Sequence, residues 1–243
     1  QYTIQINMPG NTAVDIGNVV SGGSIGGLLR YRSDVLTPAI NDLGRIAIVT
    51  ADTINSQLGQ GIDLNGEFGA SMFKDINSAA SVALRSVAAQ GNQGTGSLGV
   101  TIEDSSQLTN FDYKVTFSDA TDPSKVTVLR SDGKAMGTFD ITATPPSVID
   151  GFSLALTGGP MQAGDSFKVS PTANGAKEIG TVLTDPSKVA FAAPYPGTVL
   201  AMKLDQHGGR LICQKDSFLA GARGVQIGVQ FQRRIMTGLF GGE

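Results

Sequence analysis

A long apolar stripe at heptad spacing constrains the fold of this chain more than any other feature. Side chains that are mostly apolar recur at alternating intervals of four and three residues, namely Ile25, Leu29, Arg32, Leu36, Ala39, Leu43, Ile46 and Thr50. This spacing predicts one amphipathic helix from about residue 24 to Leu58, on the order of 50 Å long at 1.5 Å per residue. Ser24 is the expected N-cap, and Pro38 is expected to kink the helix.

Such a helix needs a partner of similar length to bury its stripe. No second uninterrupted helical pattern occurs in the sequence. The partner is therefore expected in another subunit or in missing parts of a longer chain, although an ordinary core helix would also explain the apolar character alone. The predicted interface residues are Ile25, Leu29, Leu36, Leu43 and Ile46.

Further along, the apolar period changes from that of a helix to that of a strand. Apolar residues alternate in six short segments, within 98–102, 111–117, 126–128, 139–141, 152–156 and 167–169. Clusters of Ser, Asp, Gly and Pro separate them, which predicts a small antiparallel β domain. The Asp132-Gly133 pair predicts a tight hairpin. A return segment at 175–183 is either helical or extended.

Two motifs resemble ligand sites but have the wrong context. Residues 94–99 fit G-x-G-x-x-G, yet a helix-prone stretch precedes them and a strand follows, the reverse of the dinucleotide-binding order. We interpret them as a flexible linker. Asp63, Asn65 and Glu67 alternate as in a calcium loop. Such a loop needs a glycine at its sixth position and a glutamate at its twelfth, and the sequence has neither at those positions. These residues, like Asp165, are expected to form turns.

Composition narrows the classes of function. The chain has 243 residues, 40% of them hydrophobic and 16% charged, enough for one large core or two modest ones. Its 18 basic and 21 acidic residues give a net charge of −3, which argues against nucleic-acid binding. No apolar run is long enough to cross a bilayer, and the first ten residues do not resemble a cleaved secretory signal.

Side chains suited to catalysis or metal binding are scarce. One histidine, His207, and one cysteine, Cys213, cannot supply the usual zinc ligand sets. His207 lies in a turn and Cys213 in a segment expected to be a buried strand, so a base and nucleophile pair is disfavoured. Lys215, Arg233 and Arg234 are expected on a solvated surface. The sequence therefore predicts no enzyme activity, no metal site and no cofactor.

The charge balance shifts after residue 190. Residues 191–243 hold six basic and three acidic residues, whereas the first 190 hold 12 basic and 18 acidic ones. The same tail contains the chain's single histidine and single cysteine. This difference predicts that the two segments have separate origins.

Six segments in the first four fifths of the chain follow one another in an order and spacing typical of one family, namely residues 21–32, 43–47, 61–66, 156–160, 163–167 and 184–190. They resemble the FlgK family of flagellar hook-filament junction proteins. This resemblance implies a structural, extracellular subunit without catalysis, exported through the flagellar apparatus without a cleaved signal. It also implies long helices packed around the filament axis, with a β domain on the outside. The implied partners are copies of this chain, the hook protein and the second junction protein. An export chaperone would be a further partner of the same kind of protein before export. Because the family's terminal helices are missing, an internal fragment is expected.

The tail contains four segments that do not continue this family, namely residues 191–197, 209–219, 231–234 and 238–243. They resemble a different family, the altered-inheritance-of-mitochondria (attenuator-protein-like) β-sandwiches. This resemblance implies an incomplete β-rich segment. The chain is then a composite, whether a natural fusion, an engineered fusion or an assembled sequence.

Together these observations predict an α+β fold in three parts. Residues 1–73 form a rod segment with the long helix, 74–190 an outer antiparallel β domain with linkers, and 191–243 a β-rich segment of a second family. The leading hypothesis is a motility protein at the hook-filament junction that acts through coiled-coil-like packing between subunits. The alternative is a cytoplasmic β-sandwich binding or scaffolding protein represented by the tail.

Overall fold

A computed structural model describes residues 20–119, 122–190, 200–213, 217–221 and 224–228. It also gives the backbone of two short strands, β1 (Gln5–Met8) and β2 (Thr12–Asp15), which pair antiparallel. The chain divides into two compact units. The first comprises Gln1–Asp52 with Lys74–Gly180, and the second comprises Thr53–Phe73 with Thr181–Glu243.

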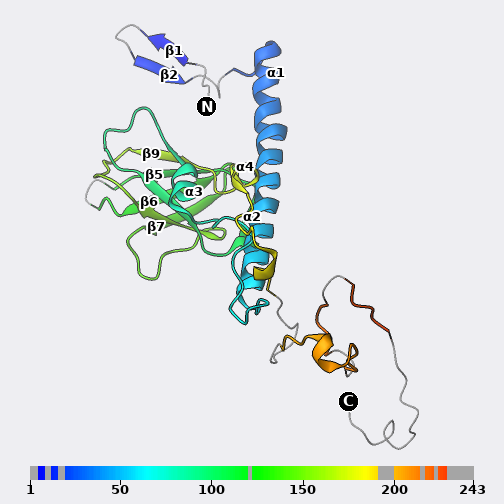
Figure 1. Cartoon of the computed structure of the whole chain (residues 1–243). Helices are drawn as coiled ribbons and strands as arrows, with labels where there is room; N and C mark the ends of the chain where they lie inside the picture. Colours follow the sequence, from blue (N-terminus) through cyan, green and yellow to red (C-terminus); the bar gives the residue numbers. More distant parts are fainter. Residues whose placement is uncertain are drawn as a thin grey trace, which may run out of the picture. The chain divides into compact units, whose positions relative to one another are not determined.

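The predicted long helix is confirmed (Figure 1). It consists of α1 (Gly23–Tyr31), a π-helical turn η1 (Arg32–Leu36) and α2 (Thr37–Gly59), which follow one another without a break. Proline causes the π-helical turn: Pro38 has no N–H for the carbonyl four residues earlier, and the chain widens so that the Thr37 N–H donates to the Arg32 carbonyl.

The predicted N-cap is wrong by two positions. Gly22 is the cap residue, with no side-chain capping bond, and its carbonyl accepts the Gly26 N–H at 3.1 Å. The helix begins at Gly23 because the bond between the Gly22 carbonyl and the Gly26 N–H is the first backbone hydrogen bond of the helix. Ser24 therefore lies inside the first turn.

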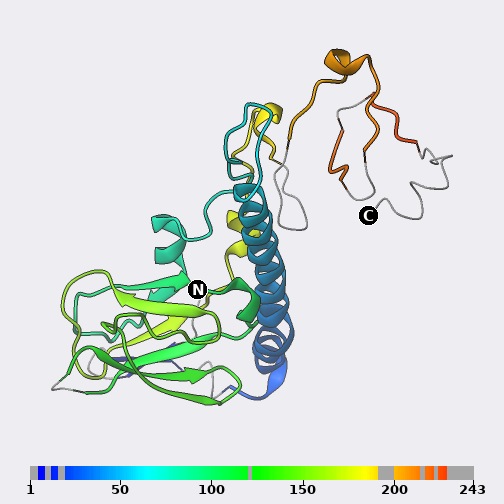
Figure 2. The same cartoon turned by 90° about the horizontal axis from the view of Figure 1, so that it is seen from below.

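The predicted antiparallel β domain is also confirmed (Figure 2). After the short helix α3 (Ala79–Leu84), its strands are β3 (Ser86–Ala88), β4 (Leu98–Ile102), β5 (Tyr113–Phe117), β6 (Lys125–Arg130), β7 (Ala135–Asp140), β8 (Phe152–Leu156) and β9 (Ser166–Val169). A five-stranded sheet has the order β3-β9-β5-β6-β7, and β4 pairs with β8 in a second sheet. Strand β3 was not predicted, because its three residues fall within a helix-prone stretch.

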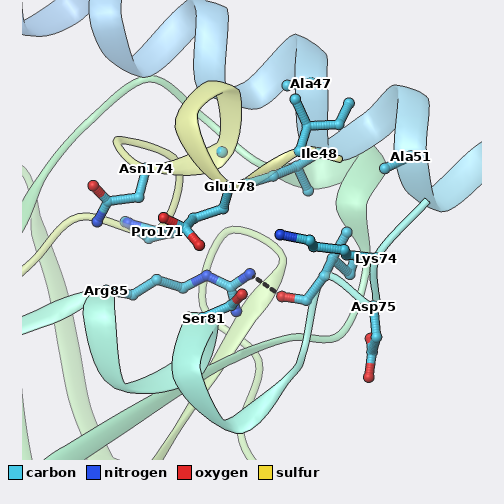
Figure 3. Close-up of a pocket in the computed structure, with 13 residues that line it drawn as sticks. Ala47, Ile48, Ala51, Lys74, Asp75, Ser81, Arg85, Pro171, Asn174 and Glu178 are labelled. Carbon is cyan, nitrogen blue, oxygen red and sulfur yellow. Dashed lines mark hydrogen bonds between the residues drawn. The ribbon is translucent and has the colours of Figure 1, made fainter. Parts of the chain in front are cut away.

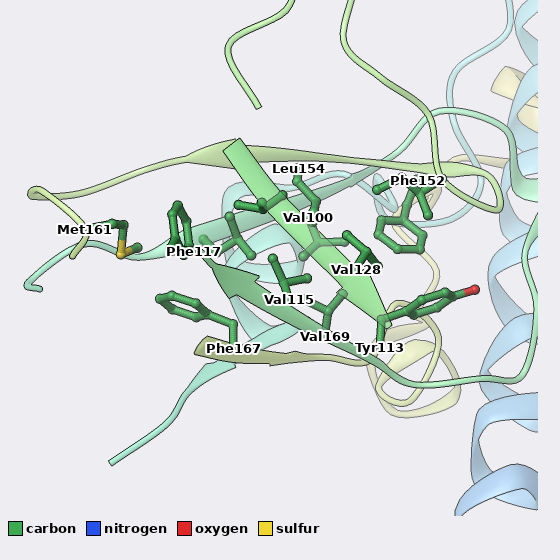
Figure 4. Close-up of a cluster of buried hydrophobic side chains, with 13 residues drawn as sticks. Val100, Tyr113, Val115, Phe117, Val128, Phe152, Leu154, Met161, Phe167 and Val169 are labelled. Atoms are coloured by element: carbon green, nitrogen blue, oxygen red, sulfur yellow. The ribbon is translucent and has the colours of Figure 1, made fainter. Parts of the chain in front are cut away.

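The core lies between these two sheets (Figure 4). Alternate residues of β5, β6 and β9 point inward, as the period of two requires, and Val115, Phe117 and Val169 are almost fully buried. Edge-to-face aromatic contacts add to the packing, with ring centroids 4.9 Å apart for Tyr113 and Phe152. Each fully buried side chain of this kind contributes about 1.5–3 kcal/mol.

A tight turn joins two neighbouring strands, as predicted. Between β6 and β7, Gly133 has a φ of +90°, a conformation that glycine adopts without strain. Its N–H donates to the Arg130 carbonyl at 2.9 Å, and the Arg130 N–H donates to the Lys134 carbonyl at 2.9 Å. The return segment forms one helical turn, α4 (Gly175–Glu178), and then becomes extended.

The glycine motif is not a flexible linker, because a buried carboxylate holds it. Asp165, which is 2% exposed, accepts the backbone N–H groups of Gln93 at 2.7 Å, Gly94 at 3.0 Å and Gln162 at 2.8 Å. A Cβ on Gly94 would lie 2.4 Å from the Asp165 carboxylate, so only glycine permits this approach. The start of the motif is therefore fixed by backbone hydrogen bonds to a buried side chain.

We expect Asp165→Asn to destabilise the protein by about 2–3 kcal/mol, because an amide cannot accept all three N–H bonds as a carboxylate does. Burial raises the pKa of Asp165, but the three N–H donors outweigh it and hold the pKa below its ordinary value of 3.8. A lowered folded-state pKa adds stability that is complete above the ordinary value and is lost as the pH falls through the folded value.

Urea denaturation between pH 7 and pH 2 checks this expectation. The difference between wild type and Asp165→Asn should be constant above about pH 5 and shrink below it. Asp185→Asn is the matched control. Asp185 is exposed, and its carboxylate accepts hydrogen bonds only from the N–H and hydroxyl of Ser187, which an amide oxygen can also accept. Equal stability of the two variants at pH 7 would contradict the role of Asp165.

In the second unit, a tight loop follows the long helix. Ile62 and Phe68 form an antiparallel bridge across it. Buried Asp63 lies within the loop, and its carboxylate accepts the N–H groups of Asn65 at 2.8 Å and Glu67 at 3.0 Å. These bonds keep the pKa of Asp63 below its ordinary value, and the bond from the Glu67 N–H has the largest effect. The carboxylate is therefore used within the loop, as the predicted turn requires.

In its described ranges the tail does not show the β-rich structure that was predicted for residues 191–243, and the rest of that prediction lies outside the described residues. Across 200–213, 217–221 and 224–228 the structure assigns one regular element, the 3-10 helix η4 (Leu204–His207), and no strand. Cys213 is exposed rather than buried in a strand. A strand needs a hydrogen-bonded neighbour, and no strand pair forms within these ranges.

Candidate subunit-packing surface

One face of the long helix anchors it to the β domain. Asn41, Ile48 and Ala51 of α2 are buried at intervals of seven and three residues, which places them on one side of the helix. Ile48 packs in a small apolar cluster with Ile102 and Leu108 of the β domain. The buried side of α2 is therefore not the side that carries the heptad stripe.

The heptad side stays exposed in the described part of the chain. Its exposed large side chains are Ile25, Leu28, Val35, Leu36, Ile40, Leu43 and Ile46. Leu43 is 60% exposed, and four of the five predicted interface residues are exposed, while Leu29 is half-buried. A monomeric soluble protein rarely leaves so long an apolar stripe in water. The arrangement suits a surface that another helix covers.

The π-helical turn changes the geometry of this stripe. Each residue of an α-helix advances by about 100°, so the extra residue of a π-helical turn rotates everything after it by about that angle. Ile25 and Leu43, 18 positions apart, would lie in line on a straight α-helix but are displaced around the axis here. The exposed surface is therefore stepped at the π-helical turn that precedes Pro38, where the sequence predicted an interruption of the helix.

Polar contacts fix the anchored face to the β domain. Asn41 is 1% exposed, and its Nδ2 donates to the Asn110 carbonyl at 2.9 Å and to the Asp112 carboxylate at 3.0 Å. Asp112 also pairs with Lys168, with 2.7 Å between Oδ2 and Nζ. The Asn110 amide donates to Asp42 at 2.9 Å. Directional bonds of this kind set the rotation of the helix against the sheet.

Two glycines bring the helix backbone against the return segment. A Cβ on Gly44 would lie 1.8 Å from the Thr172 carbonyl oxygen, and a Cβ on Gly175 would lie 2.3 Å from the Gly44 carbonyl oxygen. The clashing atoms belong to the backbone, which cannot move aside as a flexible side chain can. The close contact of α2 with the start of α4 therefore depends on both glycines.

Beside this contact lies a buried arginine with carbonyl partners (Figure 3). Arg85 donates to the Val100 carbonyl at 2.9 Å, to Asn77 Oδ1 at 3.1 Å and to the Ile76 carbonyl. Burial lowers the pKa of Arg85 to about 10, although Asp75 opposes that change. The adjacent cavity has a volume of about 30 Å³, room for roughly one water and far below the ~300–1,000 Å³ of ligand pockets.

The residues weighed for chemistry are not assembled into a site. His207, in the last turn of η4, and Cys213 are both exposed, and Lys215, Arg233 and Arg234 lie outside the described residues. Over the described ranges, no group of three or more His, Cys, Asp or Glu side chains is placed to hold a metal. In the same ranges, no helix combines the length and apolar character needed to span a membrane.

Sequence reasoning missed the anchoring residues, although part of their signal was present. Asn41, Gly44, Ile48 and Ala51 repeat at intervals of three and four on the side opposite the heptad stripe. Small and polar residues at helical spacing are a weak sign of close backbone packing. Arg85 gave no such sign, because an isolated arginine is far more often exposed.

Two family models for the same protein match successive parts of the chain. The model "Flagellar hook-associated protein FlgK helical domain" matches residues 1–73, which include the long helix. The model "Flagellar hook-associated protein 1, D2-like domain" matches residues 87–171, which include β4 to β9. A third model, "Mitochondrial biogenesis AIM24", matches residues 139–243 and overlaps the second model.

Similar proteins agree with the first two matches. The flagellar hook-associated protein 1 of Escherichia coli K12 is 31% identical over 177 residues, or 72% of this chain and 30% of that protein. Its counterpart in Salmonella typhimurium LT2 is 31% identical over 175 residues, with the same coverage. The chain thus spans about 30% of the length of these relatives.

A solved structure supports the fold as well. The flagellar hook junction protein FlgK from Burkholderia pseudomallei superposes with a TM-score of 0.63 at 32% identity, over 78% of this chain and 34% of that one. This structural likeness adds to the helical match over residues 1–73 and the β-domain match over residues 87–171. With its long helix followed by an antiparallel β domain, the chain belongs to the flagellar hook-associated protein FlgK family through residues 1–73 and 87–171.

Proposed function

We propose that this chain is part of a structural subunit at the hook-filament junction of a bacterial flagellum, where it acts by helix packing and performs no catalysis. The exposed apolar stripe of α1 and α2 carries the proposal, because it lies in the FlgK-like helical domain and the chain's own described residues leave it uncovered. The β domain holds the opposite face of the helix and so leaves the stripe free for neighbours.

The proposed partners are copies of this chain and the adjacent flagellar subunits, namely the hook protein and the second junction protein. The interface residues would be Ile25, Leu29, Leu36, Leu43 and Ile46, with Leu28 and Ile40 beside them. Burial of each exposed leucine or isoleucine against a neighbouring helix would contribute about 1.5–3 kcal/mol. The proposed location is extracellular, reached through the flagellar export route without a cleaved signal, with a chaperone as an additional partner before export.

The alternative function, a cytoplasmic β-sandwich represented by the tail, has less support. Its family match begins at residue 139, yet β8 and β9 within that match pair with β4 and β5 of the β domain. In the described ranges of the tail no strand provides a sandwich of its own.

Immunolabelling of the native protein separates the two functions. An antibody raised against the β domain, residues 98–169, should label sheared flagella at the hook end, and the labelled protein should remain inside cells that lack the flagellar export apparatus. Antibody adsorbed with the purified chain is the control. Protein that stays in the cytoplasm of export-competent, motile cells would overturn the proposed function.

A further inference from the structure

The heptad stripe keeps its spacing through the π-helical turn, but the turn breaks the stripe in space. Leu29, Leu36 and Leu43 are each seven positions apart. On a straight α-helix seven positions correspond to a net rotation of about 20°, so the three leucines would share one side. The π-helical turn lies between Leu29 and Leu36, and its extra residue places Leu29 about 120° away from Leu36 around the axis. We call this arrangement the interrupted register and that of a straight α-helix the continuous register.

Burial shows which way Leu29 turns. Leu29 is half-buried and lines a concavity of about 940 Å³ beside the five-stranded sheet, as does Asn41. Leu36 and Leu43 do not line it and are 44% and 60% exposed. Twelve positions separate Leu29 from Asn41, which would place them about 120° apart on a straight α-helix and about 20° apart with the extra residue. Their common position at the concavity therefore agrees with the interrupted register.

Pro38 favours the interrupted register. In the continuous register its ring would meet the Asp34 carbonyl, and its nitrogen has no hydrogen to donate to that carbonyl. In the π-helical turn the Thr37 N–H donates to the Arg32 carbonyl instead. Single π-helical turns of this kind occur frequently at functional sites. The interruption therefore depends on one side chain, and a residue other than proline at position 38 would remove its cause.

The turn separates an anchored part of the helix from a part that is held less firmly. Asn41, Gly44 and Ile48 fix α2 to the β domain, and all three follow the turn. On α1, Leu29 is only half-buried, and Arg30 beside it is exposed. A change of hydrogen bonding within the turn would rotate α1 by about 100° and leave the anchored part in place.

We propose that Pro38 and the π-helical turn form a register switch, which keeps Leu29 at the concavity until a neighbouring subunit's helix packs against the stripe. The turn then becomes α-helical, and Leu29 comes into line with Leu36 and Leu43. A packed helix favours the continuous register because it buries one more large apolar side chain there. Arg30 takes the place of Leu29 at the concavity, because the rotation equals that of one residue. The packing step rests on the proposed function, whereas the register that Pro38 sets does not.

Thiol reactivity of the purified chain tests the register. Leu29→Cys and Arg30→Cys are made separately in a Cys213→Ser background, which removes the exposed natural thiol. With Pro38 in place, the thiol at position 29 should react with a disulfide reagent about tenfold more slowly than the thiol at position 30. In Pro38→Ala the order should reverse, because alanine permits the continuous register. Thr37→Ala, which keeps the proline, is the matched control and should leave the order unchanged.

A pair of engineered histidines measures the turn itself and leaves Leu29 unchanged. Tyr31 and Leu36 are exposed, lie five positions apart and span the turn. Five positions are about one turn of a π-helix but about 140° on an α-helix, so only the interrupted register lets two imidazoles share one metal ion. The double variant Tyr31→His, Leu36→His should bind Ni²⁺ about 100-fold more tightly than either single variant, and adding Pro38→Ala should abolish that gain.

Substitutions in the full-length protein test the packing step. If α1 adopts the continuous register when subunits pack, Leu29→Asp should prevent incorporation into flagella as Leu43→Asp does. Arg30→Asp is the matched control, since it introduces the same carboxylate on the side that would then face the concavity, and it should incorporate normally. Circular dichroism of the purified variants checks that all of them remain folded.

Three results would overturn the switch. They are the same thiol order with and without Pro38, unchanged Ni²⁺ binding in Pro38→Ala, and normal incorporation of Leu29→Asp where Leu43→Asp is blocked. Normal incorporation of both Asp variants would overturn the packing step together with the proposed function. The thiol and metal measurements decide the register by themselves, so the two failures are distinguishable.

Discussion

Leu43→Asp is expected to abolish incorporation into flagella while leaving the fold of the chain intact. Leu43 is exposed within the chain, so its replacement should change the free energy of unfolding by no more than about 0.5 kcal/mol. In a helix interface the same change would remove about 1.5–3 kcal/mol of apolar burial and would also bury an unpaired carboxylate. Both terms oppose assembly, and neither acts on the isolated chain.

The experiment introduces the substitution into the full-length protein of the bacterium that encodes it. Motility and immunolabelling of sheared flagella report incorporation, and thermal unfolding of the purified chain reports stability. Ser56→Asp is the matched control, since it adds the same charge at an exposed position of α2 away from the stripe. Normal incorporation of Leu43→Asp would refute the stripe as an interface, as would an equal defect in Ser56→Asp.

Gly44→Ala is expected to destabilise the chain by about 3 kcal/mol, even though alanine is the better helix former. Its Cβ would lie 1.8 Å from the Thr172 carbonyl oxygen, so either the helix or the return segment must move. Movement there would also disturb the bonds that Asn41 makes to Asn110 and Asp112, three residues earlier on the helix. The close contact of α2 with the β domain would open while the sandwich core remained.

Gly27→Ala provides the comparison within the same continuous helix. No atom lies within 4 Å of a Cβ at Gly27, so this change should stabilise the helix by up to about 1 kcal/mol. Urea denaturation gives the two free energies of unfolding, and hydrogen exchange locates the change. For Gly44→Ala, amides of 37–52 should lose protection and those of β5 and β9 should keep it. Equal free energies for the two variants would contradict the close approach at Gly44.

Local periodicity was sufficient to predict the main elements. Heptad spacing gave the helix within one residue at each end, and alternation gave six strands of the β domain, because the side-chain periods of helices and strands are properties of the chain itself. The Asp132-Gly133 turn was predictable for the same reason. The tail shows the limit of reading a sequence: a family resemblance implied strands there, but its described ranges contain none, because a strand also needs a neighbour.

The sequence by itself determined that one side of a long helix is apolar and that an antiparallel β domain follows it. Only the tertiary structure decided which side of that helix the β domain covers, through Asn41, Gly44 and Ile48, and only it located Arg85 and Asp165 in the interior. Periodicity depends on neighbours within a few positions, whereas Asp165 meets Gln93 and Asn41 meets Asp112 across about seventy residues. Contacts at that separation are set by how the elements pack, and a pattern along the chain contains no measure of it.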